Sequence, residues 1–425
     1  MVKAGLVIGG GISGIQSALD LADQGYTVYL VEKNPSIGGK MAQLDKTFPT
    51  LDCAACIMTP KMVDAGRHPN IRLLTYSETQ DIRKEGEIFR VKIVRKPRYV
   101  DETKCTGCGL CALHCPIEVR NEFDEDLGVR KAIYVPFPQA VPLIYTIDKD
   151  SCIDCALCER MCQANAIDRA QQPKEVEVEV GAIIVSTGFE LFDARKKEEY
   201  GYGVYQNVIT GLALERLLSA SGPTVGHIVR PSDGRIPPRV AFLQCVGSRD
   251  EKSGNPYCSR VCCMYATKEA ILLKEHVPDI DVTIYYMDIR AYGKGFEEFY
   301  QRAQQEFGIK YIRGRVAEII EDPYTQNLFL KAENTDTGEL FDQEVDMVVL
   351  SAGLVSPRND NLKNLLPIPI GDDGFFVTSN PKSDPVTTKM DGVFIAGATE
   401  GPKDIPDSVI QASAAAMKAS NFLKD

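Results

Sequence analysis

The sequence has no apolar stretch approaching the roughly 18 residues that a membrane-spanning helix needs. It also has no excess of basic residues, because 59 acidic side chains outnumber 48 basic ones and give a formal net charge of −11. That charge argues against nucleic acid or an anionic membrane surface as the main partner. A secretory signal is absent too, since the short apolar run near the N-terminus continues directly into a glycine motif. We therefore expect a cytoplasmic protein without a membrane span.

Fourteen cysteines in a chain without an export signal need an explanation. Disulfides are rare in reducing compartments, so metal binding is the better interpretation. Two C-x-x-C-x-x-C-x-x-x-C runs predict two [4Fe-4S] clusters in a ferredoxin-type module, because three thiolates of a run hold one cube and the fourth reaches the other. The predicted ligand groups are Cys105, Cys108, Cys111 with Cys162, and Cys152, Cys155, Cys158 with Cys115. The 36 residues between the runs predict an extra hairpin.

A dinucleotide-binding pattern opens the chain. Residues 3–8 read as a buried strand, a helix follows to about residue 24, and a second strand ends at Glu32. Gly9, Gly11 and Gly14 let the turn tighten and let the backbone approach a pyrophosphate at the helix N-terminus. Glu32 follows Gly14 by 18 positions, where a carboxylate accepts ribose hydroxyls.

The ligand of this site is expected to be FAD. A second Gly-Gly at residues 38–39 resembles the extended motif of FAD-binding flavoproteins with two dinucleotide domains. In that class two further strands reach FAD, and here they end in Thr187-Gly188 and in Gly397-Ala398, where Gly-Asp is common. Asp404 or Asp407 is then the substitute for the missing aspartate. The residues expected at FAD are Gly9, Gly11, Ile12, Ser13, Gly14, Glu32, Lys33, Gly39, Lys40, Met41, Thr187, Gly188, Gly397, Asp404 and Ser408.

A second strand–helix–strand order lies between residues 239 and 287, with the helix predicted from Ser259 to His276. The glycine fingerprint of a nicotinamide site is missing after its first strand, and four cysteines stand there: Cys245, Cys258, Cys262 and Cys263. From spacing alone, a metal cluster and a set of buried core thiols are both open. Lys268 on the same helix is a candidate catalytic cation for reduced flavin, and the alternative is an exposed helix lysine.

Cys53 and Cys56 form a separate C-x-x-C. Three interpretations are open: two ligands of a fourth cluster completed by a partner, a redox dithiol near the flavin, or inert core thiols. We take the first as the working prediction.

The expected fold class is α/β, a two-dinucleotide-binding-domain flavoprotein similar to thioredoxin reductase with an inserted ferredoxin domain. The predicted division is an FAD domain in three parts, an insertion, and a nicotinamide-type domain rebuilt around a cluster. Its boundaries are 1–100, 172–236 and 356–425 for the FAD domain with its linker, 101–171 for the insertion, and 237–355 for the rebuilt domain.

The sequence resembles the flavin-containing A subunits of heterodisulfide reductases. The match rests on residues 9–14, 52–62, 244–249, 257–268 and 288–300, and on both cysteine runs. The resemblance implies a [4Fe-4S] cluster on Cys245, Cys258, Cys262 and Cys263 beside FAD, for three clusters in all. It also implies that the N-terminal domain and the C-terminal ferredoxin module of long members are missing, so that partners supply those electron routes. Short versions resemble components of anaerobic assemblies such as the tungsten-type benzoyl-CoA reductase complexes.

These observations predict an electron-transfer flavin and iron–sulfur subunit of an anaerobic oxidoreductase complex, in which FAD splits, merges or relays electron pairs. The partners implied are iron–sulfur subunits, electron-input subunits of NAD, ferredoxin or hydrogenase type, ferredoxin itself, and a second copy of the chain. One alternative is a self-contained NAD(P)H-dependent flavin oxidoreductase. The other is a non-catalytic electron wire or assembly subunit with structural FAD.

Overall fold

The computed structural model describes residues 2–357 and 360–424. Residue contacts divide the chain into two compact units. Unit 1 comprises Met1–Ala42, Ala55–Phe189 and Ser356–Asp425, and unit 2 comprises Gln43–Ala54 and Glu190–Val355. The cysteine-rich insertion falls within unit 1, and the finer division into five segments stays a prediction. Within the described ranges, no helix is both long and apolar enough to cross a bilayer.

Unit 1 is built on a five-stranded parallel sheet in the order β21-β11-β1-β2-β3. The buried run predicted for residues 3–8 and the strand predicted to end in Thr187-Gly188 become β1 and β11 of this sheet, because parallel strands covered on both faces are apolar throughout. The chain leaves β1 towards β2 on one side and returns through β11 on the other, which creates a topological switch point. The strands are β1 (Ala4–Ile8), β2 (Thr27–Glu32), β3 (Ile71–Thr75), β11 (Ala182–Val185) and β21 (Val393–Ile395).

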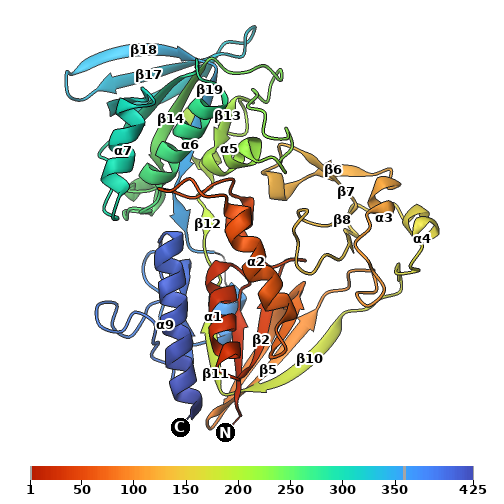
Figure 1. The fold of residues 1–425 in the computed structure, drawn as a ribbon. Helices are drawn as coiled ribbons and strands as arrows, with labels where there is room; N and C mark the ends of the chain where they lie inside the picture. Colours follow the sequence, from red (N-terminus) through yellow and green to blue (C-terminus); the bar gives the residue numbers. More distant parts are fainter. Residues whose placement is uncertain (1, 358–359, 425) are drawn as a thin grey trace. The chain divides into compact units, whose positions relative to one another are not determined.

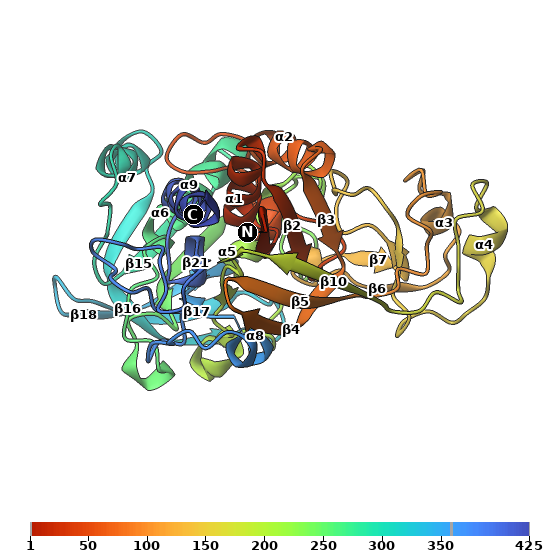
Figure 2. The ribbon, with the colours of Figure 1, turned by 90° about the horizontal axis from the view of Figure 1, so that it is seen from below.

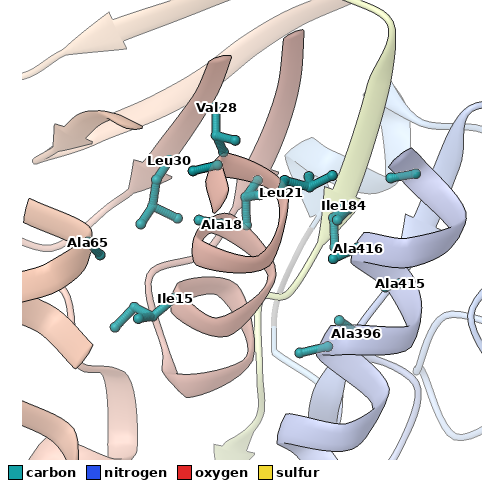
Figure 3. Close-up of a cluster of buried hydrophobic side chains, with 14 of the residues drawn as sticks. Ile15, Ala18, Leu21, Val28, Leu30, Ala65, Ile184, Ala396, Ala415 and Ala416 are labelled. Carbon is teal, nitrogen blue, oxygen red and sulfur yellow. The ribbon is translucent and has the colours of Figure 1, made fainter. Parts of the chain in front are cut away.

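Helices α1 and α9 pack side by side against this sheet (Figure 1). Alanines of α9 (Ile405–Lys424) meet Ile15, Ala18 and Leu21 of α1 (Ile12–Asp23) in one buried cluster. Figure 3 shows Ala415 and Ala416 of α9 within this cluster, with Ile184 of β11 close by. Small side chains at this contact let the two helices approach closely. The other helices of unit 1 outside the insertion are α2 (Ala54–Arg67) and α8 (Asp360–Leu365).

The insertion leaves unit 1 through a three-stranded antiparallel sheet of β4 (Ser77–Glu85), β5 (Ile88–Arg95) and β10 (Lys174–Val180). Its short helices α3 (Leu110–Leu113) and α4 (Leu157–Met161) lie away from β2 and β3 (Figure 2). The extra hairpin predicted between the cysteine runs is confirmed, since β6 (Glu118–Arg120) pairs with β7 (Val129–Lys131) and β8 (Ile133–Tyr134) pairs with β9 (Thr146–Ile147).

Arg98 anchors the insertion to the dinucleotide domain of unit 1. Its guanidinium is buried and donates to the Pro35 carbonyl at 2.7 Å, and to the side chains of Thr75, Glu102 and Thr146. Pro35 lies three residues after Glu32, the predicted ribose-binding acid, so the Arg98 side chain links that turn to the root of the insertion.

Unit 2 contains a seven-stranded sheet in the order β13-β19-β14-β15-β16-β17-β18. The strands from β13 to β16 are parallel, and β17 and β18 extend the sheet as an antiparallel pair that the sequence did not predict. The main strands are β13 (Val208–Thr210), β14 (Arg239–Val246), β15 (Asp281–Tyr286), β16 (Lys310–Glu321), β17 (Leu328–Asn334), β18 (Glu339–Val345) and β19 (Met347–Ala352). A small second pair joins β12 (Glu190–Leu191) to β20 (Leu354–Val355).

The helices of unit 2 are α5 (Gly211–Leu218), α6 (Cys262–His276) and α7 (Phe296–Gln305). The prediction that α6 begins at Ser259 is wrong by three residues. Arg260 has a positive φ of 63° and therefore cannot belong to a right-handed helix. As a result, Cys262 and Cys263 occupy the first turn, where side chains are free to leave the helix surface in different directions.

The packing of α9 on α1 gives a test of the fold. Ala416 is fully buried in the unit 1 cluster, whereas Ala414 on the same helix is exposed. Ala416→Leu overfills the contact and should lower the free energy of unfolding by about 1–3 kcal/mol. The matched variant Ala414→Leu should change it by less than about 0.5 kcal/mol. Chemical denaturation of both variants makes the comparison, and equal effects would contradict the packing described.

Candidate flavin site and iron–sulfur centres

The loop after β1 lacks room for side chains. Gly9 has a φ of +107°, and a Cβ on Gly14 would lie 1.8 Å from the Gly9 carbonyl oxygen. A Cβ on Gly39, whose φ is +56°, would lie 2.9 Å from the Cα of Gly11. The two glycine segments therefore lie against each other at the start of α1, where free N–H groups and the helix dipole favour a phosphate.

Glu32 ends β2 with its carboxylate buried. Its Oε2 accepts the backbone N–H of Gly10 at 2.7 Å, and its Oε1 accepts that of Asn34 at 2.8 Å. Burial raises the pKa of Glu32, and these two hydrogen bonds oppose the rise. Each carboxylate oxygen keeps a second lone pair, so the side chain retains acceptors for ribose hydroxyls.

The ends of β11 and β21 come to the same edge of the sheet. Gly188 donates its backbone N–H to Thr399 Oγ1 at 3.2 Å. Gly397 has a φ of +69°, and a Cβ there would lie 2.0 Å from Ser13 Oγ and 3.8 Å from Ser408 Cβ. Residues that are far apart in the sequence thus adjoin where a dinucleotide is expected.

The remaining predicted flavin residues differ in exposure. Ile12 and Met41 pack on the unit 1 core, whereas Lys33 and Gly39 are exposed. Lys40 pairs with Glu125 of the insertion at 3.9 Å. Asp404 precedes α9, where its Oδ1 accepts the backbone N–H of Asp407 at 2.8 Å and its carbonyl accepts that of Ser408. Asp404 therefore caps the helix, a role that the sequence pattern did not reveal.

One thiol group of the insertion lines a single cavity. Cys115, Cys152, Cys155 and Cys158 surround it together with Ile117 and Ile147. Desolvation raises the pKa of Cys158, followed by the electrostatic effect of Cys152, Cys155 and Cys115. This arrangement supports the predicted crossing of Cys115 to the second run.

For the other predicted ligand group, the structure brings Cys105 and Cys108 near Cys111 but does not test the place of Cys162. The pKa of Cys111 is raised to about 12, first by burial and then by Cys105, Cys108 and Cys158. Cys162 packs in the same small core, and its Sγ accepts the backbone N–H of Ala166 at 3.3 Å. The assignment of Cys162 to this group stays a prediction.

The four cysteines of unit 2 gather where β14 ends and α6 begins. The pKa of Cys245 is raised to about 11, first by burial and then by Cys263 and Cys258. Cys262 is buried and has Cys245, Cys263 and Cys258 as its electrostatic neighbours. Cys245 has a φ of +60°, at an irregularity between Leu243 and Val246 that turns the chain out of the strand.

A serine pair holds the two halves of this thiol group together. Ser248 Oγ accepts the backbone N–H and the hydroxyl of Ser259, both at 3.0 Å. Ser259 Oγ in turn accepts the backbone N–H of Leu354 at 2.8 Å. The segment that carries Cys258 is thereby fixed beside the turn that carries Cys245. These serines were missed because the sequence reads as an ordinary polar loop.

Each thiol set offers the four cysteines that a [4Fe-4S] cluster takes as ligands. In the described part of the chain, no three His, Cys, Asp or Glu side chains converge as a single metal ion would require. Iron binding would displace the thiol protons, so the cysteines of a loaded site would be thiolates although the pKa values of the free thiols are raised.

Lys268 is not the exposed helix lysine of the alternative interpretation. It is 1% exposed; its ammonium forms an ion pair with Glu215 and donates to the Lys46 carbonyl at 2.8 Å. Glu269 beside it is also buried, and one of its carboxyl oxygens, Oε2, has no hydrogen-bond partner among the described residues. Burial and Glu215 raise the pKa of Glu269 well above its usual value. A catalytic role of Lys268 towards flavin stays a prediction.

Cys53 and Cys56 are joined by a disulfide, and both are exposed. The interpretation as buried core thiols is therefore wrong. As a disulfide the pair offers no thiolate to iron, so cluster ligation by these residues would require prior reduction. The predicted role as metal ligands stays open on that condition.

Comparisons with known proteins agree with this geometry. The description "NAD(P)-binding Rossmann-like domain" matches residues 7–71, and "4Fe-4S binding domain" matches residues 98–120 and 145–168. The chain adopts the fold of thioredoxin reductases from T. acidophilum and Lactococcus lactis, each with a TM-score of 0.56, at 15% and 16% identity. These alignments cover 99% of this chain and 98% and 99% of those chains. The expected fold class is confirmed.

Curated relatives match over nearly the whole chain. It is 60% identical over 422 residues to the iron-sulfur A subunit of the CoB–CoM heterodisulfide reductase of Methanocaldococcus jannaschii, covering 98% of this chain and 64% of the relative. It is 57% identical to the A subunit of the H2:CoB-CoM heterodisulfide,ferredoxin reductase of Methanothermobacter thermautotrophicus, covering 98% of this chain and 63% of that one. The chain therefore spans somewhat less than two thirds of these relatives.

Gly14 provides a test of the flavin site. Gly14→Ala places a methyl group against the Gly9 carbonyl and pushes α1 away from the loop. We expect the ratio of bound FAD to protein to fall at least about tenfold, as expected when a phosphate loses its close backbone contact. The flavin absorbance of purified protein measures this ratio. Asp23→Ala, at an exposed site on the same helix, should retain wild-type flavin; full loading of Gly14→Ala would contradict the assignment.

Glu269 provides a pH test. Because burial raises its pKa, the folded protein keeps a proton that the unfolded chain loses near pH 4.5. The stability of the wild type should therefore fall as the pH rises from 4.5 towards the folded-state pKa. Glu269→Gln cannot titrate, so its Tm relative to wild type should increase from about pH 5 to about pH 8. The exposed Glu275→Gln on the same helix is the control, and a constant Tm difference for Glu269→Gln would refute the buried proton.

Proposed function

We propose that the chain belongs, over the part that it spans, to the family of heterodisulfide reductase A subunits. On that premise it is the flavin and iron–sulfur electron-transfer subunit of an oxidoreductase complex. FAD exchanges electrons in pairs, whereas a [4Fe-4S] cluster exchanges them singly. The reduction potential of ferredoxin-type clusters is about −400 mV. The residues would provide one FAD site in unit 1, two clusters in the insertion and one cluster in unit 2.

The observation that carries this proposal is the thiol group of unit 2. A parallel sheet normally binds a dinucleotide beyond the carboxyl end of the strand that begins its βαβ unit. In unit 2 that strand is β14, and Cys245, Cys258, Cys262 and Cys263 adjoin its end. Four thiolates in this place favour a one-electron carrier in place of a hydride carrier.

The partners follow from the same chemistry. The names of these two relatives describe reductases of the CoB–CoM heterodisulfide, and the name of the Methanothermobacter thermautotrophicus protein also includes ferredoxin. For this chain we propose ferredoxin-type donors or acceptors and iron–sulfur partner subunits in the cytoplasm, together with a second copy of the chain. Flavin-based splitting of electron pairs belongs to this proposal. The C-x-x-C at Cys53 and Cys56 would, when reduced, offer ligands to a fourth cluster completed by a partner.

A self-contained NAD(P)H-dependent flavin oxidoreductase is the less favoured function. The loop after β14 holds cysteines in place of the glycine fingerprint, and a Cβ on Gly247 would already meet the Phe192 ring at 2.1 Å. Little room is left there for a pyrophosphate. The alternative of a structural FAD with no electron transfer is addressed by the same experiment.

The experiment compares the anaerobically reconstituted wild type with the double variant Cys262→Ser/Cys263→Ser. Loss of one cube should remove about four irons per chain and slow the reduction of FAD by reduced ferredoxin at least about tenfold. NADH and NADPH should reduce neither protein rapidly.

Flavin content serves as the internal control, because the FAD residues lie in unit 1 and the substitutions lie in unit 2. An unchanged iron content would disprove the cluster. Rapid reduction of wild-type FAD by NADH would revive the oxidoreductase alternative, and FAD that no donor reduces would favour a structural cofactor.

A further inference from the structure

Gln244 has a buried side-chain amide that the fold does not use. Both Nε2 and Oε1 are inaccessible to solvent and have no hydrogen-bond partner among the described residues. Buried amides in proteins almost always have partners, so such a group calls for one that is not part of the chain. Gln244 directly precedes Cys245, at the end of β14.

By its position in the strand, Gln244 belongs to the face of the sheet that α6 covers. Successive residues of a strand point to opposite faces. Ala241 and Leu243 belong to a hydrophobic cluster with Phe192 and Tyr285, and no described residue of α6 joins that cluster although α6 packs on β14. Alternation from Leu243 would direct Gln244 towards the opposite face, just before the strand becomes irregular, and the first turn of α6 carries Cys262 and Cys263 on that face.

The group that adjoins this amide would be a hydrogen-bond acceptor. Cys245 follows Gln244 in the chain, and its electrostatic neighbours are Cys263 and Cys258. Cysteine thiolates and the sulfides of a cube accept hydrogen bonds and donate none. Only the Nε2 end of the amide can therefore pair with them.

We propose that Gln244 Nε2 donates an N–H···S hydrogen bond to the cluster on Cys245, Cys258, Cys262 and Cys263 and so raises its reduction potential. A donor stabilises the reduced cluster more, because that state carries one more negative charge. Gln244 is thus a positioning residue that sets how readily single electrons enter this cluster. The inference rests on the proposed function, since it needs the cluster to be present.

A small cavity at the same end of β14 offers a competing explanation. Gln244 lines it together with Arg249 and Arg315, and also with Leu243 and Tyr285, which belong to the hydrophobic cluster on the face of the sheet away from α6. The cations at its rim are already engaged, since Arg249 donates to Asp288 at 2.6 Å and the Arg315 guanidinium interacts with the Tyr200 phenol. This leaves little to attract an anion, but a solvent molecule there would also satisfy the amide without touching the cluster.

The test is a redox titration of the reconstituted chain followed by EPR. The signal of this cluster is identified as the part of the spectrum that Cys262→Ser/Cys263→Ser lacks. Gln244→Leu keeps the size of the side chain and removes the donor. We expect its midpoint potential to fall by the equivalent of about a tenfold change in the one-electron equilibrium, which is about 59 mV. An exchangeable-proton coupling seen by pulsed EPR in the wild type should disappear as well.

Two further variants make the result decisive. Gln301→Leu, on an exposed site of α7, should leave potential and coupling unchanged. Gln244→Asn keeps the amide but shortens its reach, so it should weaken the coupling. This variant still tests the inference if Gln244→Leu fails to fold. A wild type without the cluster signal would defeat the proposed function itself. A cluster with the same potential and coupling in the wild type and in the Gln244 variants that fold would overturn this inference alone and assign the amide to solvent in the cavity.

Discussion

Both units depend on one property of parallel sheets, which is that the carboxyl ends of all their strands meet at one edge. In unit 1 this property brings the loop after β1, Glu32, Gly188 and Gly397 together from four separate strands. In unit 2 the same edge receives the turn at Cys245 and the first turn of α6. The edge is built alike in both units, and the residue types in the loops decide whether it suits a dinucleotide or a metal cluster.

Burial shifts the pKa values of the buried thiol and carboxyl groups. Thiols at Cys111 and Cys245 are held neutral by desolvation, so iron must displace protons to bind them. In unit 2 the buried ion pair of Lys268 and Glu215 lies beside Glu269, whose pKa is raised well above its usual value by burial and by Glu215. At the low dielectric constant of the interior, the negative charge of an electron on a cluster interacts strongly with nearby charged and polar groups. Hydrogen-bond donors near the cluster therefore have a large influence on its potential.

Local patterns were sufficient wherever function needs neighbouring residues. The glycines between Gly9 and Gly14 and both ferredoxin cysteine runs have spacings set by the ligand itself, so they could be recognised without a structure. The start of α6 was misplaced because a positive φ at Arg260 leaves no trace in composition. The role of Asp404 as a cap of α9 was not recognised, and its expected contact with flavin stays a prediction. The antiparallel strands β17 and β18 were missed because their alternating polar residues resemble a loop.

The sequence by itself determined which cofactors the chain is suited to, because glycine turns and cysteine runs follow the shapes of a pyrophosphate and an iron cube. The tertiary structure alone decided that Lys268 is buried and paired, that Cys53 and Cys56 are exposed and bonded to each other, and that the side-chain amide of Gln244 is buried without a partner among the described residues. Burial, ion pairs and hydrogen bonds depend on residues contributed by distant segments. The ion pair of Lys268 with Glu215 and its hydrogen bond to the Lys46 carbonyl are examples. No local spacing contains that information.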